Sequence, residues 1–220
     1  IVYVEDGRQF IVEKMLGKGG FGEVYKVHSS KDPDKKLAMK VEKRELDPKK
    51  KNSHLRLKID VFLRVERVAD SFCDKTHFVK MHAKGNAKTF TFYVMDLIWA
   101  SLRDIVEDIL KNVSFSPSTK IQIARQTLKG IEALHELGYI YRDIKSANFA
   151  VGLPPNDNII YLTDFGIARP YRNEITATRL RQASMIRIRV LRYASARALE
   201  HQEQSRRDDL EVWMYMMIQV

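Results

Sequence analysis

The chain has 220 residues, and 38 lysines and arginines against 28 aspartates and glutamates give it a formal net charge of +10. This length allows one large domain or two small ones, and a 45% apolar and 30% charged composition is ordinary for a globular protein. The single cysteine, Cys73, excludes an internal disulfide and favours a reducing compartment. The longest uncharged apolar run, 212–218, is too short to cross a bilayer.

The positive charge is concentrated in two segments. The first is lysine-rich and centred on 49–51, which predicts a solvated loop or, alternatively, a nuclear-localisation or nucleic-acid-binding segment. No aromatic residues alternate with these lysines, as base stacking would require. The second segment holds eight arginines: Arg169, Arg172, Arg179, Arg181, Arg187, Arg189, Arg192 and Arg197. Guanidinium groups suit phosphate and carboxylate, so this segment predicts an anion site, with a solvated basic loop as the alternative.

The first part of the chain is predicted to be mostly strands. Three strands are expected at 10–16, 23–28 and 36–41. Turn-forming residues at 31–34 separate the second strand from the third. Ser53 can cap a helix, and apolar residues then recur every three or four positions, which predicts a helix to about Val68. Two further strands are expected at 78–79 and 89–95.

The second part is predicted to be mainly helical. Apolar spacing over 102–109 indicates a short amphipathic helix. Ser116 and Pro117 combine an N-cap with proline at the first helical position, and the helix they begin should end at Gly138. Two short strands are expected at 149–151 and 159–163. A last helix at 210–220 is apolar nearly all round, which predicts burial on every side.

Four motifs with a shared chemistry follow one another along the chain. They are Gly17-Lys18-Gly19-Gly20-Phe21-Gly22-Glu23-Val24, Leu37-Ala38-Met39-Lys40, Tyr141-Arg142-Asp143-Ile144-Lys145-Ser146-Ala147-Asn148 and Asp164-Phe165-Gly166. Glycines let a backbone fold closely over phosphate groups, although such a loop alone is a weak signal and also fits a plain hairpin. All four motifs in this order are similar to the signature set of protein kinases.

Each motif predicts a role in phosphoryl transfer, which depends on positioning and on charge neutralisation. Lys40 would pair with the nucleotide phosphates, and Asp143 would act as the base or orient the acceptor hydroxyl. Lys145 would neutralise the transferred phosphate. Asn148 and Asp164 offer the oxygen ligands that Mg²⁺ prefers. The alternatives are an exposed strand lysine at position 40 and turn or cap formation by Asp143 and Asn148.

Finer features resemble the casein kinase 1 superfamily and its tau-tubulin-kinase-like branch. These features are the catalytic-loop sequence above, Arg192-Tyr193-Ala194-Ser195, and Gln204-Ser205-Arg206-Arg207-Asp208-Asp209-Leu210-Glu211. The resemblance implies an α+β, bilobal fold with a β lobe at 1–95, a hinge at 96–100, and a helical lobe at 101–220 that lacks its last helices. It also implies that Met95 is the gatekeeper at the nucleotide pocket.

The resemblance further implies the ligands and partners of the site. The residues expected to contact ATP are Leu16, Gly17, Lys18, Gly19, Gly20, Phe21, Gly22, Glu23, Val24, Ala38, Lys40, Met95, Asp96 and Ile98. ATP and Mg²⁺ are the expected cofactors, and serine or threonine in acidic or already phosphorylated proteins is the expected acceptor. Neither a membrane nor nucleic acid is expected as a partner, and the expected location is the cytoplasm and also the nucleus.

Four positions differ from the pattern of the superfamily. Asp60 stands where a glutamate should pair with Lys40, and although it is one methylene shorter, it is expected to form this pair if the helix moves inward. Arg189-Val190 replaces Gly-Thr, and Trp99 replaces a hinge glycine at the pocket mouth. These departures leave a catalytically weak pseudokinase that acts as a binding or scaffold protein as the alternative function.

Overall fold

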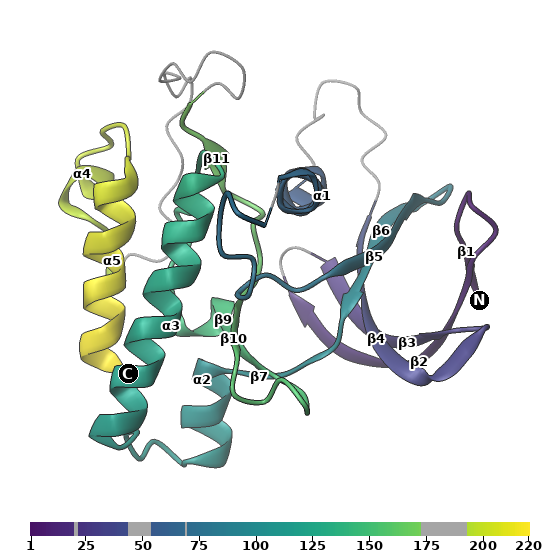
Figure 1. The fold of residues 1–220 in the computed structure, drawn as a ribbon, viewed down its shortest axis with the longest axis horizontal. Coiled ribbons are helices and arrows are strands. Elements are labelled where there is room, and N and C mark those ends of the chain that lie inside the picture. The colour runs from purple at the N-terminus through teal and green to yellow at the C-terminus, as the bar shows by residue number, and fades with distance from the viewer. Residues whose placement is uncertain (20–21, 44–53, 69, 173–192) are drawn as a thin grey trace.

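A computed structural model describes residues 1–19, 22–43, 54–68, 70–172 and 193–220. Gly20, Phe21, the lysine-rich segment, Ser53 and Arg189-Val190 lie outside the described residues, as do five of the eight arginines. The described chain consists of a curled antiparallel sheet with one helix beside it and a mainly helical part (Figure 1). This arrangement confirms the predicted α+β class.

The sheet contains the first six strands of the chain. They are β1 (Val2–Tyr3), β2 (Gln9–Gly19), β3 (Gly22–Ser29), β4 (Asp32–Lys43), β5 (Met81–Asn86) and β6 (Phe90–Asp96), in the spatial order β1-β2-β3-β4-β6-β5. Side chains alternate between the two faces of a strand, so Leu37 and Met39 of β4 pack in the interior of the curled sheet. Ala38 and Lys40 therefore face the other way, towards the helical part.

Two predictions for the first part are corrected by the sheet. The turn between β3 and β4 occupies residues 30–31, because Ser29 already pairs with Asp32, and the rest of the predicted turn lies in β4. The strand predicted at 78–79 lies at Met81–Asn86 instead. Phe78 and Val79 are apolar because they are buried in the core between the two parts, and Phe78 forms only an isolated bridge with Leu162.

The helix α1 (His54–Arg67) confirms the predicted helix and lies between the sheet and the helical part (Figure 1). Its buried residues Val61, Phe62 and Val65 recur at the spacing of one helix face. Lys58 precedes Val61 by three positions and Phe62 by four, so it lies on this same buried face. Asp60 lies on the opposite face and is exposed.

The helical part is built on α3 (Pro117–Glu136) and α5 (Arg206–Gln219), which lie side by side (Figure 1). The remaining elements are α2 (Leu102–Asp104), the π-helix η2 (Ile105–Ile109), the short helix η3 (Ser146–Asn148), α4 (Ala196–Leu199), and strands β7 (Ile98–Ser101), β8 (Tyr139–Ile140), β9 (Phe149–Gly152), β10 (Ile160–Leu162) and β11 (Arg169–Pro170). The predicted cap of α3 is present, because the Ser116 hydroxyl accepts a hydrogen bond from Thr119 N. Gly138 follows α3 with a φ of +90°, which side chains disfavour.

The composition of α5 favours burial on every side, but without further partners part of its apolar surface is exposed. Met216 is fully buried, whereas Met214 and Ile218 are exposed. Within the part of the chain that the structure describes, none of the helices combines the length and the apolarity that a bilayer crossing requires.

Candidate active site

A cavity of about 320 Å³ lies between the sheet and the helical part. It brings together residues from all four motifs, although the first two motifs are more than one hundred positions from the last two in the sequence. Of the predicted site residues, those that line it are Leu16, Gly17, Val24, Ala38, Lys40, Met95, Ile98, Asn148 and Asp164. The apolar side chains form the walls and the charged ones gather at one end, a composition typical of ligand pockets.

Several cavity residues were not predicted from the sequence. They are Phe62, Val79, Tyr93, Leu97, Ala100, Ser101, Asp104, Ala147, Ala150 and Thr163. Most are apolar residues without a motif, so nothing in the sequence distinguishes them from core residues. Trp99 was expected at the pocket mouth, and it does line the cavity, with 56% of its surface exposed.

Five predicted nucleotide contacts lie elsewhere. Four residues around the β2–β3 turn line a different cavity of about 480 Å³ on the interior side of the curled sheet: Lys18, Gly19, Gly22 and Glu23. A Cβ atom on Gly22 would lie 2.0 Å from the carbonyl oxygen of Val41, so the close approach of the backbone at this turn requires glycine. The carboxylate of Asp96 accepts hydrogen bonds from His82 Nε2 at 2.6 Å and Lys80 N at 3.0 Å, and does not line the nucleotide cavity.

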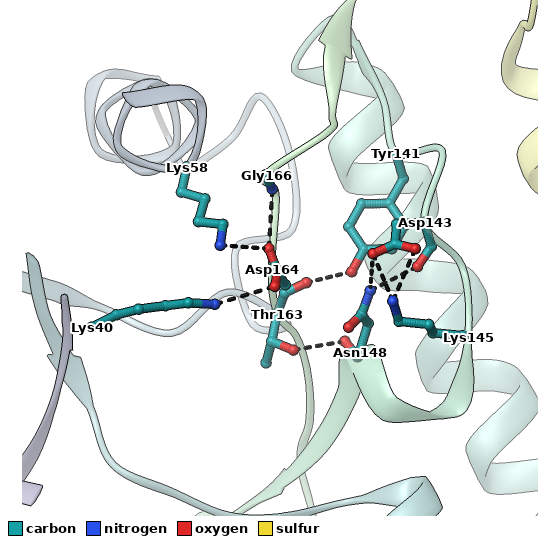
Figure 2. Close-up of polar contacts among 9 residues, drawn as sticks. All are labelled: Lys40, Lys58, Tyr141, Asp143, Lys145, Asn148, Thr163, Asp164 and Gly166. Carbon is teal, nitrogen blue, oxygen red and sulfur yellow. Dashed lines mark hydrogen bonds and ion pairs between the residues drawn. The ribbon is translucent and has the colours of Figure 1, made fainter. Parts of the chain in front are cut away.

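Asp164 is in contact with two lysines, which reach its carboxylate from the same side (Figure 2). Its Oδ2 is 3.1 Å from Lys40 Nζ, and its Oδ1 is 2.8 Å from Lys58 Nζ. Oδ1 also accepts a hydrogen bond from Gly166 N at 3.1 Å. Asp164 has a φ of +54°, an uncommon backbone conformation for a residue other than glycine, and such conformations concentrate at functional sites.

The predicted pair between Lys40 and Asp60 is wrong in this structure. Residues two apart on a helix point about 200° apart, so Lys58 and Asp60 cannot both lie on the buried face of α1. The apolar residues of α1 place the Lys58 face inward, where this side chain has no exposed surface. The spacing of Lys58 with Val61, Phe62 and Val65 is visible in the sequence and could have identified it.

The electrostatics of this cluster favour a charged Asp164. Burial alone would raise its pKa, but Lys40 and Lys58 outweigh burial and hold the pKa well below its usual range. Burial is also the main cause of the change at Lys58, whose pKa falls to about 8 although Asp164 opposes the fall. For Lys40, burial is outweighed by effects that include the Asp164 carboxylate, so its pKa is raised.

Asp143 and its partners form the second polar group of the site (Figure 2). Lys145 Nζ donates to both carboxylate oxygens of Asp143, at 3.0 and 2.9 Å. The amide nitrogen of Asn148 donates to Asp143 Oδ2 at 2.9 Å and to its carbonyl at 2.8 Å. Asp143 is buried, so these bonds fix the direction of its carboxylate. The predicted motif residues are thus held in one network.

Hydrogen bonds from neighbouring elements hold the Asp143 loop beside the Asp164 segment. The hydroxyl of Tyr141 donates to the carbonyl of Thr163, and the Thr163 hydroxyl donates to the carbonyl of Asn148 at 3.0 Å. Arg142 has a φ of +65° and its Nε donates to the carbonyl of Ile167 at 3.0 Å. These bonds connect the third motif to the fourth.

Asp209 of α5 anchors the same loop by accepting hydrogen bonds from its backbone. Its Oδ2 accepts from Tyr141 N at 2.7 Å and lies 2.8 Å from His135 Nε2, and its Oδ1 accepts from Arg142 N at 2.9 Å. Asp209 is buried, so it satisfies two backbone N–H groups that would otherwise be unpaired. The sequence contains Asp209 within a family motif, but its target cannot be identified without the fold.

The donor types of the cavity suit Mg²⁺, but their arrangement does not. Asp164 and Asn148 supply a carboxylate and an amide oxygen, as a magnesium site requires. Both oxygens of Asp164, however, are in contact with ammonium groups. Among the described residues, there is no group of three or more histidine, cysteine, aspartate or glutamate side chains that could hold a metal ion. A metal ion at Asp164 would have to displace at least one of these ammonium groups, so the residues as arranged do not present a free carboxylate to a metal.

Comparisons with known proteins agree with this geometry. The sequence profile of the protein kinase domain matches residues 10–218. A Caenorhabditis elegans protein, ZK507.3, whose name assigns it to the serine/threonine-protein kinases, is 32% identical over 208 residues, covering 92% of this chain and 50% of that protein. Casein kinase I homolog 3 of Schizosaccharomyces pombe is 32% identical over 219 residues, covering 96% of this chain and 46% of that protein. The chain thus spans about half the length of the curated relatives it matches.

Proposed function

Because the chain belongs to the protein kinase family, we propose that it binds ATP in the cavity between its two parts and transfers the γ-phosphoryl group to serine or threonine of protein substrates. The observation that carries this proposal is the convergence of Lys40, Asp164 and Asn148 on the cavity. In this proposal, residues 1–95 form the nucleotide lobe, 96–100 the hinge and 101–220 the helical lobe.

The residues have separate tasks in the transfer. The apolar walls formed by Val24, Ala38 and Met95 hold the adenine ring and exclude water. Lys40 is a cation that neutralises the phosphates, and its raised pKa keeps it charged at neutral pH. Asp143 orients the acceptor hydroxyl and takes up its proton, and Lys145, already within 3.0 Å of Asp143, neutralises the charge that builds up on the transferred group.

We propose acidic or already phosphorylated proteins as substrates, in line with the resemblance to casein kinase 1. Support comes from Arg142 and Arg169, which are close enough for Arg169 to contribute to the pKa of Arg142. Burial is the main cause of that lowered pKa of about 10, and repulsion from Arg169 is the second. Guanidinium groups suit phosphate and carboxylate, and two of them lie near each other here, with the Asp209 carboxylate also close to Arg142. Arg172 and Arg197 are the other described members of the arginine segment.

The pseudokinase alternative has one observation in its favour. Lys58 contacts the carboxylate of Asp164 at 2.8 Å, where a kinase site would present that carboxylate to a metal. A chain in this state could bind a nucleotide without transferring phosphate, and could serve as a scaffold.

Radiolabelled ATP turnover on casein tests the proposal. We expect incorporation of label by the wild type, and a loss of at least about a hundredfold in Lys40→Met and in Asp143→Asn, because each variant removes a charge that acts on the reacting groups. Lys14→Met is the matched control, because Lys14 is an exposed lysine of the same sheet. Label incorporation that is equal in Lys40→Met and in the wild type would refute the kinase assignment. Nucleotide binding without any turnover would favour the pseudokinase.

A further inference from the structure

The charge balance around Asp164 differs from the one that the sequence motif predicted. Lys40 and Lys58 are two cations around a single carboxylate, so the cluster carries one surplus positive charge. Had Asp60 taken the place of Lys58, two carboxylates would surround one lysine and the surplus would be one negative charge. The difference between the two arrangements is two charges, which equals the charge of one divalent cation.

The position of Lys58 places this charge inside the site, directly against Asp164. Its ammonium lies 2.8 Å from Asp164 Oδ1, whereas Lys40 contacts Oδ2, and the two lysines reach the carboxylate from the same side (Figure 2). The side chain lies on the buried face of α1 and has no exposed surface, so bulk water screens its charge little. Lys58 offsets the negative charge of Asp164, and the charge of Lys40 is then available to a ligand in the cavity.

We propose that Lys58 is an internal counter-cation that takes over the electrostatic role of a divalent metal, so that this site binds the triphosphate of a nucleotide without requiring Mg²⁺. Lys58 does not line the cavity and is therefore a positioning residue. It acts through Asp164 and through the electrostatic potential at the phosphate position. This inference rests on the proposed nucleotide site, but not on its catalytic activity.

Three groups near the cluster bear on this balance. Tyr93 is buried and its pKa is raised to about 12, mainly by burial, so it remains neutral at physiological pH. Asp143 is compensated by Lys145, and Asp104 lies in the cavity wall within a capping box with Ser101. None of these three described residues supplies a carboxylate that cancels the charge of Lys58.

Equilibrium nucleotide binding tests the proposal, with trinitrophenyl-ATP fluorescence as the readout and titrations in EDTA and in excess Mg²⁺. For the wild type we expect dissociation constants that agree within about threefold in the two buffers. For Lys58→Met we expect binding in EDTA to weaken about tenfold or more, because a buried unit charge near the phosphates is lost, and Mg²⁺ to restore most of it. Lys58→Arg keeps the charge and should behave as the wild type.

The matched control is Arg67→Met, which removes a positive charge from the exposed side of the same helix and should leave both constants unchanged. Thermal unfolding identifies a variant that fails to fold, and the wild type and Lys58→Arg then still decide the question. Wild-type binding that weakens more than tenfold in EDTA would overturn the inference while the proposed function stands. An equal loss in both buffers for Lys58→Met would show that Lys58 only holds α1 in place. No binding in either buffer would refute the proposed function as well.

Discussion

At the scale of single residues, the orientation of α1 decides which charged side chain lies beside Asp164. A motif comparison selects Asp60, because a carboxylate is expected opposite Lys40. Helix geometry selects Lys58, because it shares a face with the buried Val61 and Phe62. Burial of the apolar side chains of α1 stabilises the fold more than a carboxylate partner for Lys40 would. Lys58 lies on the same face as these side chains, so it is buried with them and contacts Asp164.

Asp60→Ala tests this choice of face. Because Asp60 is exposed, we expect the variant to keep its kcat/KM for ATP within about twofold and its unfolding free energy within about 0.5 kcal/mol of the wild type. Asp60→Glu should be equally silent. Steady-state kinetics and urea denaturation provide the measurements. A tenfold loss of activity in Asp60→Ala, rescued by glutamate, would show that α1 turns the other face to Lys40 in the working protein.

At the scale of elements, α5 supports the catalytic loop through one carboxylate. Asp209 is located on the first turn of α5, and its three partners come from α3 and from the segment after β8. A neighbouring carboxylate, Asp208, accepts from the Ser195 hydroxyl at 2.8 Å and so attaches the start of α4 to the same helix turn. Two adjacent buried aspartates thus connect α5 to three segments that are distant in the sequence.

Asp209→Asn should weaken the connection between α5 and the catalytic loop. An amide keeps one oxygen acceptor and replaces the other by an NH₂ group, which would face an N–H donor of the loop. We expect a loss of about 1–3 kcal/mol in unfolding free energy and a lower kcat, because only one of the two backbone N–H groups keeps an oxygen acceptor. Glu132→Gln, an exposed change on α3, is the control for urea denaturation and kinetics. A variant as stable as this control would argue against the anchoring role.

The sequence predicted where a helix occurs more easily than it predicted which strands pair with each other. The helix at Pro117–Glu136 was recognisable from its cap, its apolar spacing and Gly138, which are all local signals. The strand at Met81–Asn86 was misplaced, because its sequence is polar and its pairing with β6 decides its conformation. Strand β7 pairs with β9 across about fifty residues, and no local pattern reveals such a partner.

At the scale of the whole molecule, an aromatic cluster joins the β-rich part to the helical part behind the cavity. Phe165 is buried, and its ring centroid lies 5.4 Å from that of Phe62 and 5.9 Å from those of Phe78 and Tyr141. Phe62 also contacts Tyr93 of β6 at 5.4 Å. The order of the motifs predicted that their residues would meet. Phe165 and Tyr141 belong to motifs, but Phe62, Phe78 and Tyr93 do not, and so the sequence did not single out Phe62.

Phe62→Ala should therefore affect stability and nucleotide binding together. Phe62 is buried, lines the cavity and contacts rings from both parts, so its removal leaves a void that the structure can fill only in part. We expect a loss of about 3–5 kcal/mol in unfolding free energy, and a smaller loss for Phe62→Leu, which fills more of the space. In the folded fraction the KM for ATP should rise, because α1 then holds Lys58 less firmly against Asp164. If Phe62→Ala were to unfold at the same urea concentration as the wild type, the cluster would not be the connection between the two parts.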